Sequence, residues 1–139
     1  MNIVPHLCFD GECREAFAEY QRIFGGKIET MMTYGESPMA NDVPKECYDR
    51  IVHATLHIDD LEIAGADLLP QDYKRPQGFF VLVSIPILED AKRIFQLLSE
   101  GGIVHLPFAE TFWAQGFGVV IDRFETPWEI NSNAASPSA

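Results

Sequence analysis

The stretches EAFAEYQRIFGG (residues 15–26) and DAKRIFQLLSEGG (residues 90–102) decide the fold, because the second repeats the pattern of the first. In each stretch the apolar residues recur at the three- and four-residue spacing of a helix that buries one face. A Gly-Gly pair follows each helix, where glycine supplies the left-handed conformation of a C-terminal cap. We therefore expect two equivalent amphipathic helices, one in each half of the chain.

Short strands are expected around each helix. In the first half they span residues 3–9, 27–34, 50–58 and 61–67, and Asp59-Asp60 forms the turn of the last hairpin. In the second half they span residues 79–85, 103–108, 117–121 and 127–130. The order strand, helix, strand, strand, strand thus occurs twice. This order predicts an α+β fold of two tandem βαβββ modules.

The remaining segments predict the domain organisation. We expect residues 1–131 to form a single domain, with module one at 1–68, a proline-containing linker at 69–78 and module two at 79–131. Residues 132–139 are rich in Ser, Asn and Ala and are expected to form a flexible tail. The loop from Gly35 to Tyr48 is long, and its length suggests a mobile lid.

Charge and cysteine content exclude several classes of protein. Lys and Arg total 10 against 21 Asp and Glu, a net charge of -11 that repels phosphate backbones and anionic lipids, so neither nucleic acid nor membrane is an expected partner. No segment offers the roughly 20 apolar residues of a membrane span, and the N-terminus lacks the pattern of a secretory signal. The three cysteines form no C-x-x-C pair. We expect a cytoplasmic protein without disulfides.

Short motifs run through nearly the whole chain in the order of one family. They are Leu7-x-Phe9-x-Gly11, Ile23-Phe24-Gly25-Gly26, His53-Ala54, Thr111-Phe112-Trp113, Phe117-Gly118-x-Val120-x-Asp122 and Trp128-x-Ile130-Asn131. By these motifs the chain resembles a PhnB-like protein of the vicinal-oxygen-chelate (glyoxalase/bleomycin-resistance/dioxygenase) superfamily. The resemblance implies a curved, half-closed mixed sheet built by the two modules, a cavity between them and a homodimer.

The resemblance also implies where a divalent metal would bind. Enzymes of the superfamily hold the metal with His and Glu side chains from the first, fourth, fifth and eighth strands. Glu129 matches the final glutamate ligand and His6 lies near the first ligand, whereas the fourth and fifth strands lack ligands at their centres. At most two of the four expected ligands are therefore present. A divalent metal stays open as a cofactor, and the alternative for His6 and Glu129 is a structural or hydrogen-bonding role.

Other side chains are candidates for contacting a ligand. The resemblance directs His53 toward the cavity, and Asp67 offers a carboxylate near the end of the fourth strand. Phe112 and Trp113 are suited to stacking on a planar ligand. For each of these residues the alternative is ordinary packing or hydrogen bonding within the fold. No catalytic residue is assigned.

Two functions remain open from the sequence. The first is a homodimer that binds a small molecule in the cavity between its modules without chemistry, comparable to the antibiotic-resistance members, and the acidity of the chain suits a cationic drug. The second is a metal-dependent lyase, isomerase or dioxygenase that acts on a small oxygenated metabolite. The missing metal ligands count against the second function. A methyltransferase is not supported, because no Gly-rich loop joins a strand to a helix.

Overall fold

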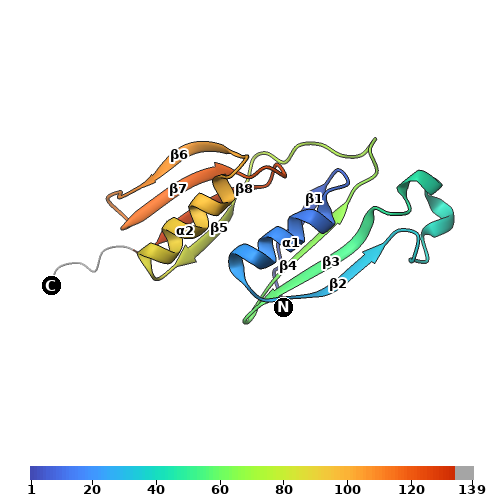
Figure 1. Ribbon diagram of the computed structural model, residues 1–139, viewed down its shortest axis with the longest axis horizontal. Coiled ribbons are helices and arrows are strands. Elements are labelled where there is room, and N and C mark those ends of the chain that lie inside the picture. Colours follow the sequence, from blue (N-terminus) through green and yellow to red (C-terminus); the bar gives the residue numbers. More distant parts are fainter. Residues whose placement is uncertain (134–139) are drawn as a thin grey trace. The chain divides into compact units, whose positions relative to one another are not determined.

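The computed structural model describes residues 1–133, and the chain divides after Lys74 into two compact units. Unit 1 comprises residues Met1–Lys74 and unit 2 begins at Arg75. Each unit contains one four-stranded sheet and one long helix (Figure 1). No helix within residues 1–133 is long and apolar enough to cross a membrane.

The two units have the same topology. Unit 1 contains β1 (His6–Phe9), α1 (Cys13–Phe24), β2 (Lys27–Thr33), β3 (Ile51–Ile58) and β4 (Leu61–Asp67), with strand order β1-β4-β3-β2. Unit 2 contains β5 (Val81–Ile85), α2 (Leu88–Ser99), β6 (Ile103–Ala109), β7 (Gly116–Ile121) and β8 (Pro127–Ser132), with strand order β5-β8-β7-β6. In each unit the first and last strands pair in parallel and the other pairs are antiparallel. The predicted α+β fold of two tandem βαβββ modules is confirmed.

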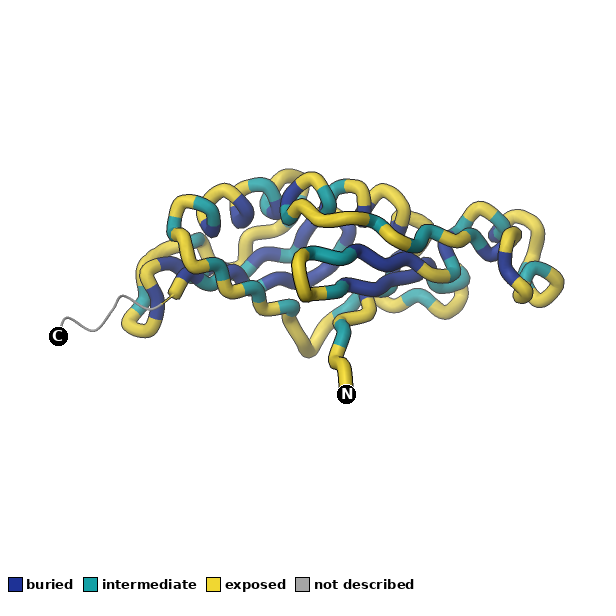
Figure 2. The backbone as a smooth tube through the Cα atoms, turned by 90° about the horizontal axis from the view of Figure 1, so that it is seen from below, coloured by how far each residue is buried: buried dark blue, intermediate teal, exposed yellow. Residues whose placement is uncertain are grey.

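Helix α1 covers one face of the unit 1 sheet because its apolar stripe is continuous. Phe17 and Tyr20 are fully buried, and the Phe17 ring packs edge-on against Phe9 of β1 at a centroid distance of 6.2 Å. Gly65 of β4 makes this packing close, since a Cβ atom there would lie 2.6 Å from the Phe17 ring. In Figure 2 the buried residues follow the inward side of the helices and the strands beneath them.

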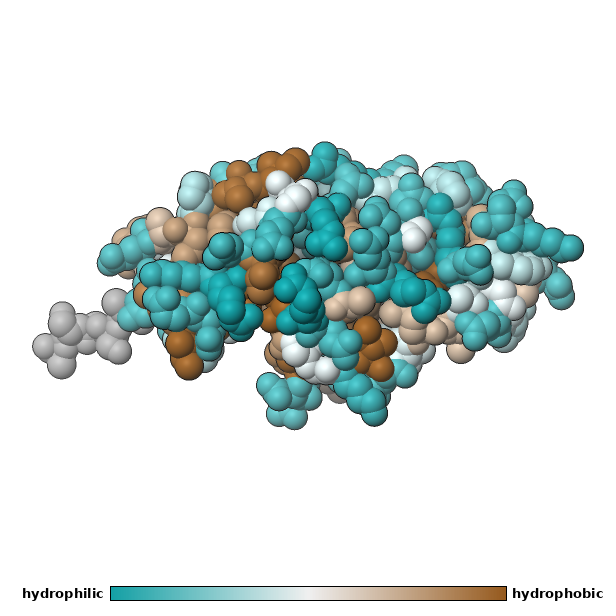
Figure 3. All heavy atoms as spheres, viewed as in Figure 1, coloured by the Kyte–Doolittle hydropathy of each residue, from teal (hydrophilic) through white to brown (hydrophobic). Residues whose placement is uncertain are grey.

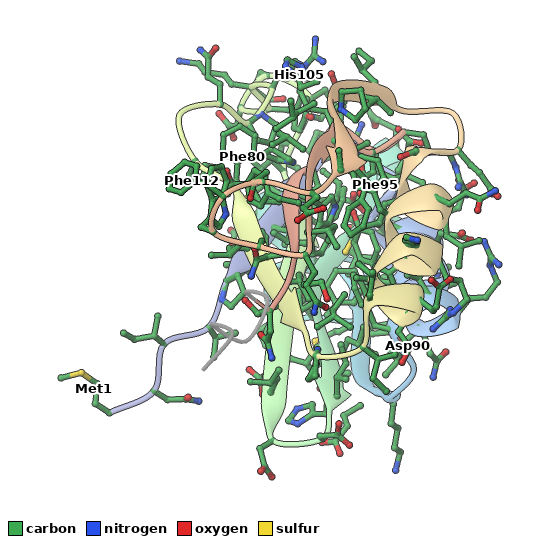
Figure 4. The ribbon with its side chains drawn as sticks, turned by 90° about the vertical axis from the view of Figure 1, so that its left-hand side faces the viewer. Met1, Phe80, Asp90, Phe95, His105 and Phe112 are labelled. Atoms are coloured by element: carbon green, nitrogen blue, oxygen red, sulfur yellow. The ribbon has the colours of Figure 1, made fainter. Side chains whose placement is uncertain are left out.

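Helix α2 packs on the unit 2 sheet in the same way. Its residues Ala91, Ile94, Phe95 and Leu98 are buried. Figure 4 shows Phe95 directed from α2 toward the strands, whereas Asp90 at the start of the helix points to solvent. The predicted amphipathic pattern of both helices is therefore confirmed.

The Gly-Gly pairs combine the predicted cap with a second role. The residue after the C-cap of each helix, Gly26 after Gly25 and Gly101 after Glu100, has the positive φ predicted for a glycine cap, 89° and 72°. The second glycine of each pair also permits close approach to a strand. A Cβ atom on Gly26 would lie 2.2 Å from the carbonyl oxygen of His57, and one on Gly102 would lie 2.3 Å from that of Ile121. The positive φ predicted for glycine at the end of each helix is therefore present in both halves of the chain.

The long loop after β2 has a defined structure. It contains two 3-10 helices, Ala40–Asp42 and Lys45–Cys47. Its ends are joined because the backbone N–H of Gly35 donates to the carbonyl of Tyr48 at 3.0 Å. The role of this loop as a lid stays a prediction.

The observed units and strands bear on only part of the predicted domain organisation. The division between the units falls within the predicted linker, residues 69–78. A single domain over residues 1–131 stays a prediction. Ser132 belongs to β8 and is fully buried, so the tail cannot begin there, and residues 134–139 lie outside the described part of the chain.

Candidate functional site

Each sheet has a second face that the helix of its own unit does not cover, here called the helix-free face. In unit 1 Phe9, Ala54 and Leu56 are buried on the side of α1. Because successive side chains of a strand point to opposite faces, His53 and His6 lie on the helix-free face. Both histidines are exposed. Two predicted site residues from different strands therefore share one face of unit 1.

Small side chains surround His6 on the helix-free face of unit 1. The strand partners of His6 and Cys8 on β4 are Ala64 and Ala66, whose side chains are single methyl groups. The Cys8 thiol lies 3.8 Å from Nδ1 of His6. Burial raises the pKa of the Cys8 thiol. Cys8 is therefore a weak nucleophile at neutral pH, because the thiolate is the reactive form.

Asp67 has a structural role that the sequence did not reveal. Its Oδ1 accepts hydrogen bonds from the backbone N–H groups of Gly11 and Cys13 at 2.8 and 3.0 Å, and its Oδ2 accepts one from Ile51 at 2.8 Å. These bonds cap α1, whose own N-terminal residue Glu12 forms no side-chain cap. Asp67 is only 1% exposed, so no side of its carboxylate is open to a ligand. We therefore leave Asp67 out of the candidate site and correct its assignment to a structural residue.

The helix-free face of unit 2 carries a single charged side chain from its strands. Trp128 and Ile130 of β8 are fully buried beneath α2, so Glu129 between them points to the helix-free face. Glu129 pairs with Leu82 of β5 and Val119 of β7, and Val119 pairs with Leu106 of β6. No other residue of β5 to β8 is Asp, Glu, Lys or Arg. Glu129 thus places a carboxylate among three apolar side chains, and together the four residues form a row across all four strands of the sheet.

Aromatic side chains lie beside this row. The Trp113 ring contacts the ring of Phe117 on β7 at a centroid distance of 5.3 Å, and the Phe112 ring contacts Trp113 at 4.7 Å. Phe112 is 98% exposed, and in Figure 4 it projects outward from its loop. The loop is held by a hydrogen bond from the N–H of Ala114 to the Thr111 hydroxyl at 3.1 Å. The structure therefore brings the predicted residues Trp113 and Glu129 to one face.

Sequence reasoning gave no role to Phe117 and Asn131, although both occur in the quoted motifs. They form a strand pair on the helix-free face, one pair along from Val119 and Glu129. The Oδ1 atom of Asn131 is buried and has no hydrogen-bond partner among residues 1–133. Alternation around Gly118 and Ile130 is the signal that could have identified them.

The chain has clear relatives, although no family model matches it. Protein PA1353 from Pseudomonas aeruginosa is 36% identical, and the match covers 96% of this chain and 98% of that one with a TM-score of 0.88. The PhnB protein from Bacillus cereus has a TM-score of 0.79 at 19% identity, over 95% and 99% of the two chains. Protein YjdN of Escherichia coli K12 is 34% identical over 99% of both chains. The chain belongs to the PhnB-like family.

More distant structures share the fold of this PhnB-like chain. The fosfomycin resistance protein FosX from Listeria monocytogenes, solved with Mn(II), has a TM-score of 0.66 at 11% identity over 96% and 93% of the two chains. The chain therefore shares the fold of FosX and of a glyoxylase/bleomycin resistance protein/dioxygenase domain from Frankia sp. EAN1pec.

The metal-ligand positions of this PhnB-like chain are incompletely filled. His6 pairs with Ala64, and Glu129 pairs with Leu82, so each strand pair offers only one ligating side chain. Within residues 1–133 no group of three or more His, Cys, Asp or Glu side chains is arranged to hold a metal ion. These residues do not fit the full ligand set of a catalytic metal, which needs at least three protein ligands in most sites.

Proposed function

We propose that this PhnB-like protein binds a small organic molecule, and that a homodimer is its functional form. The observation that carries the proposal is the cluster of Trp113, Phe117 and Glu129 on the helix-free face of unit 2. Small-molecule sites are mostly apolar and contain a few polar groups that orient the ligand. The cluster has this composition.

Apolar surface around the cluster supports the proposal. Leu82, Ile103 and Leu106 are large apolar side chains that remain substantially exposed. Figure 3 shows apolar residues gathered at the surface over the first half of β6. Exposed apolar patches on small proteins commonly mark binding surfaces. A ligand or a second subunit that covered this surface would gain the free energy of removing it from water.

Unit 1 contributes a second group of candidate ligand contacts. His6 and His53 lie on its helix-free face, and each imidazole can donate or accept a hydrogen bond according to its tautomer. A cavity that both modules line stays a prediction from the family resemblance. His53 is the residue of unit 1 that we assign to ligand contact.

A metal-dependent lyase, isomerase or dioxygenase is the second candidate function. Two observations favour it: the carboxylate of Glu129 has no side-chain partner among residues 1–133, and FosX, which shares the fold, was solved with Mn(II). The incomplete ligand set counts against it.

A thermal-shift experiment distinguishes the two candidates. The purified protein is screened against neutral, cationic and anionic aromatic compounds, and separately against Mn, Zn, Ni, Co and Mg ions with chelator controls. A ligand that binds only the native state raises the melting temperature. We expect aromatic compounds to raise it, and Trp113→Ala to abolish the shift while Leu61→Ala, which removes an exposed apolar residue of unit 1, leaves it intact.

The opposite result is equally clear. If divalent ions alone raise the melting temperature, and Glu129→Gln and His6→Ala each remove that shift, the metal-dependent function replaces the proposed one. If no compound and no ion has an effect, neither function stands. Sedimentation velocity tests the homodimer directly, and a monomer at micromolar concentration would refute that part of the proposal.

A further inference from the structure

We propose that the helix-free face of unit 2 selects flat organic cations that carry N–H donors. This inference rests on the proposed function and names its ligand class. The selecting groups are the carboxylate of Glu129, the rings of Trp113 and Phe117, and the amide oxygen of Asn131.

The negative charge of the Glu129 carboxylate has no ion-pair partner in the described part of unit 2. Within residues 75–133 the side chain of Glu129 forms no hydrogen bond or ion pair, and only its backbone is paired, in the β5–β8–β7 ladder. The cationic side chains of unit 2 lie outside its strands and are Arg75, Lys92, Arg93 and Arg123. Arg75 pairs with Glu125 at 3.3 Å, and Arg123 stacks on Phe124. No described strand of unit 2 supplies a Lys or Arg side chain beside Glu129, so a cationic ligand would supply the opposite charge there.

The aromatic rings favour the same kind of ligand. Trp113 is 44% exposed, and its plane is inclined at 68° to that of Phe117. The two rings therefore present surfaces in two directions, one for stacking and one for edge contact. The faces of aromatic rings attract cations, and tryptophan does so most strongly. A flat cation gains stacking and electrostatic attraction from this arrangement, whereas a flat anion is repelled by Glu129.

Asn131 adds a requirement for hydrogen-bond donors. Its Oδ1 is buried without a partner within residues 1–133, and a buried acceptor that lacks a donor is unfavourable. Asn131 and Glu129 are two residues apart on β8 and point to the same face, so their Cα atoms lie about 7 Å apart. Both groups accept hydrogen bonds. A ligand with N–H groups along one edge satisfies both acceptors once a rotation of the Asn131 side chain exposes its Oδ1.

The test compares two ligands of nearly equal shape. At neutral pH 9-aminoacridine is a flat cation with an amino group, and acridine is the uncharged ring system. Isothermal titration calorimetry at moderate salt and with a chelator measures the Kd of each for the wild type, Glu129→Gln and Glu110→Gln. Glu110 is an exposed carboxylate of the β6–β7 loop, so its variant has the same net charge as Glu129→Gln.

We expect 9-aminoacridine to bind the wild type about tenfold more tightly than acridine, and Glu129→Gln to remove that difference. Glu110→Gln should change either Kd by less than about twofold, because exposed charges are screened by salt. Trp113→Leu should weaken both ligands, since each stacks on the ring. Unchanged melting temperatures of the unliganded variants show that they fold normally.

Three results would overturn the inference. They are equal affinity for the two ligands, equal effects of the two glutamate variants, and preferential binding of an aromatic sulfonate anion. In each case a small molecule still binds, so the proposed function stands and only the cation selectivity fails. If neither acridine binds and the full thermal-shift screen is silent, the proposed function fails as well.

Discussion

The most direct test of the architecture is the substitution Asp67→Asn. The side chains have nearly the same shape, but the amide places an NH2 group where one carboxylate oxygen was. In the native protein that oxygen accepts a hydrogen bond from the N–H of Ile51, and the other accepts from Gly11 and Cys13. The amide orientation that retains the bonds to Gly11 and Cys13 leaves the N–H of Ile51 buried and opposed to a donor.

The expected loss in the free energy of unfolding follows from these hydrogen bonds. An unsatisfied buried donor costs about 1–3 kcal/mol, and a hydrogen bond to a charged acceptor contributes about 1 kcal/mol more than one to a neutral acceptor. The smaller desolvation penalty of the neutral amide offsets part of the loss. We expect the free energy of unfolding to fall by about 3 kcal/mol, a large fraction of the ~5–15 kcal/mol typical of a protein.

Urea denaturation followed by circular dichroism measures this change. Asp60→Asn is the matched control, because it makes the same chemical change at an exposed turn position and should alter stability by less than about 0.5 kcal/mol. Asp67→Ala should lose more than Asp67→Asn, since all three N–H groups then lack their acceptor. A loss below about 1 kcal/mol for Asp67→Asn, combined with weakened ligand binding, would show that Asp67 serves the ligand and not the fold.

Three further predictions concern other parts of unit 1. Gly65→Ala should lower the free energy of unfolding by about 2 kcal/mol in urea, because its Cβ would lie 2.6 Å from the Phe17 ring, and an unchanged midpoint would contradict that packing. Cys8 should be the only cysteine that reacts with a thiol reagent in the native protein, and slowly, because burial raises its pKa; rapid modification of the other two cysteines, which are buried, would refute this. Hydrogen bonds from the Thr33 side chain and backbone lower the pKa of Glu36, so they stabilise the fold above the unfolded pKa of Glu36 and lose that effect as pH falls through its folded pKa. Thr33→Val should raise the pKa of Glu36 in an NMR titration, and no change would mean that the hydroxyl bond is absent in solution.

The order of elements could be predicted because its signals are local. Residues 15–26 and 90–102 contain a complete helical stripe and its glycine pair, and each strand shows its own apolar run. The structure moves most strand and helix ends by only one or two residues from the predicted ranges. Ends are less certain because hydrogen bonding to distant segments decides where a strand stops, as the burial of Ser132 in β8 illustrates.

The candidate site could be predicted only in part. The family resemblance singled out His53 and Glu129, and the structure places both on the face of their sheet that points away from the helix. The role of Asp67 was not accessible in this way, because it bonds to Cys13 across 54 residues of sequence. A carboxylate at a strand end has the same local signature whether it binds a ligand or caps a helix.

The sequence by itself determined two βαβββ modules and the amphipathic helix of each, because helical and strand periods repeat over neighbouring residues. Only the tertiary structure decided which side chains meet: Asp67 with the start of α1, and Trp113 with Phe117 beside Glu129. These contacts depend on the register between strands and on the path of a loop. Both are set by the packing of residues that are distant in sequence, which local spacing does not specify.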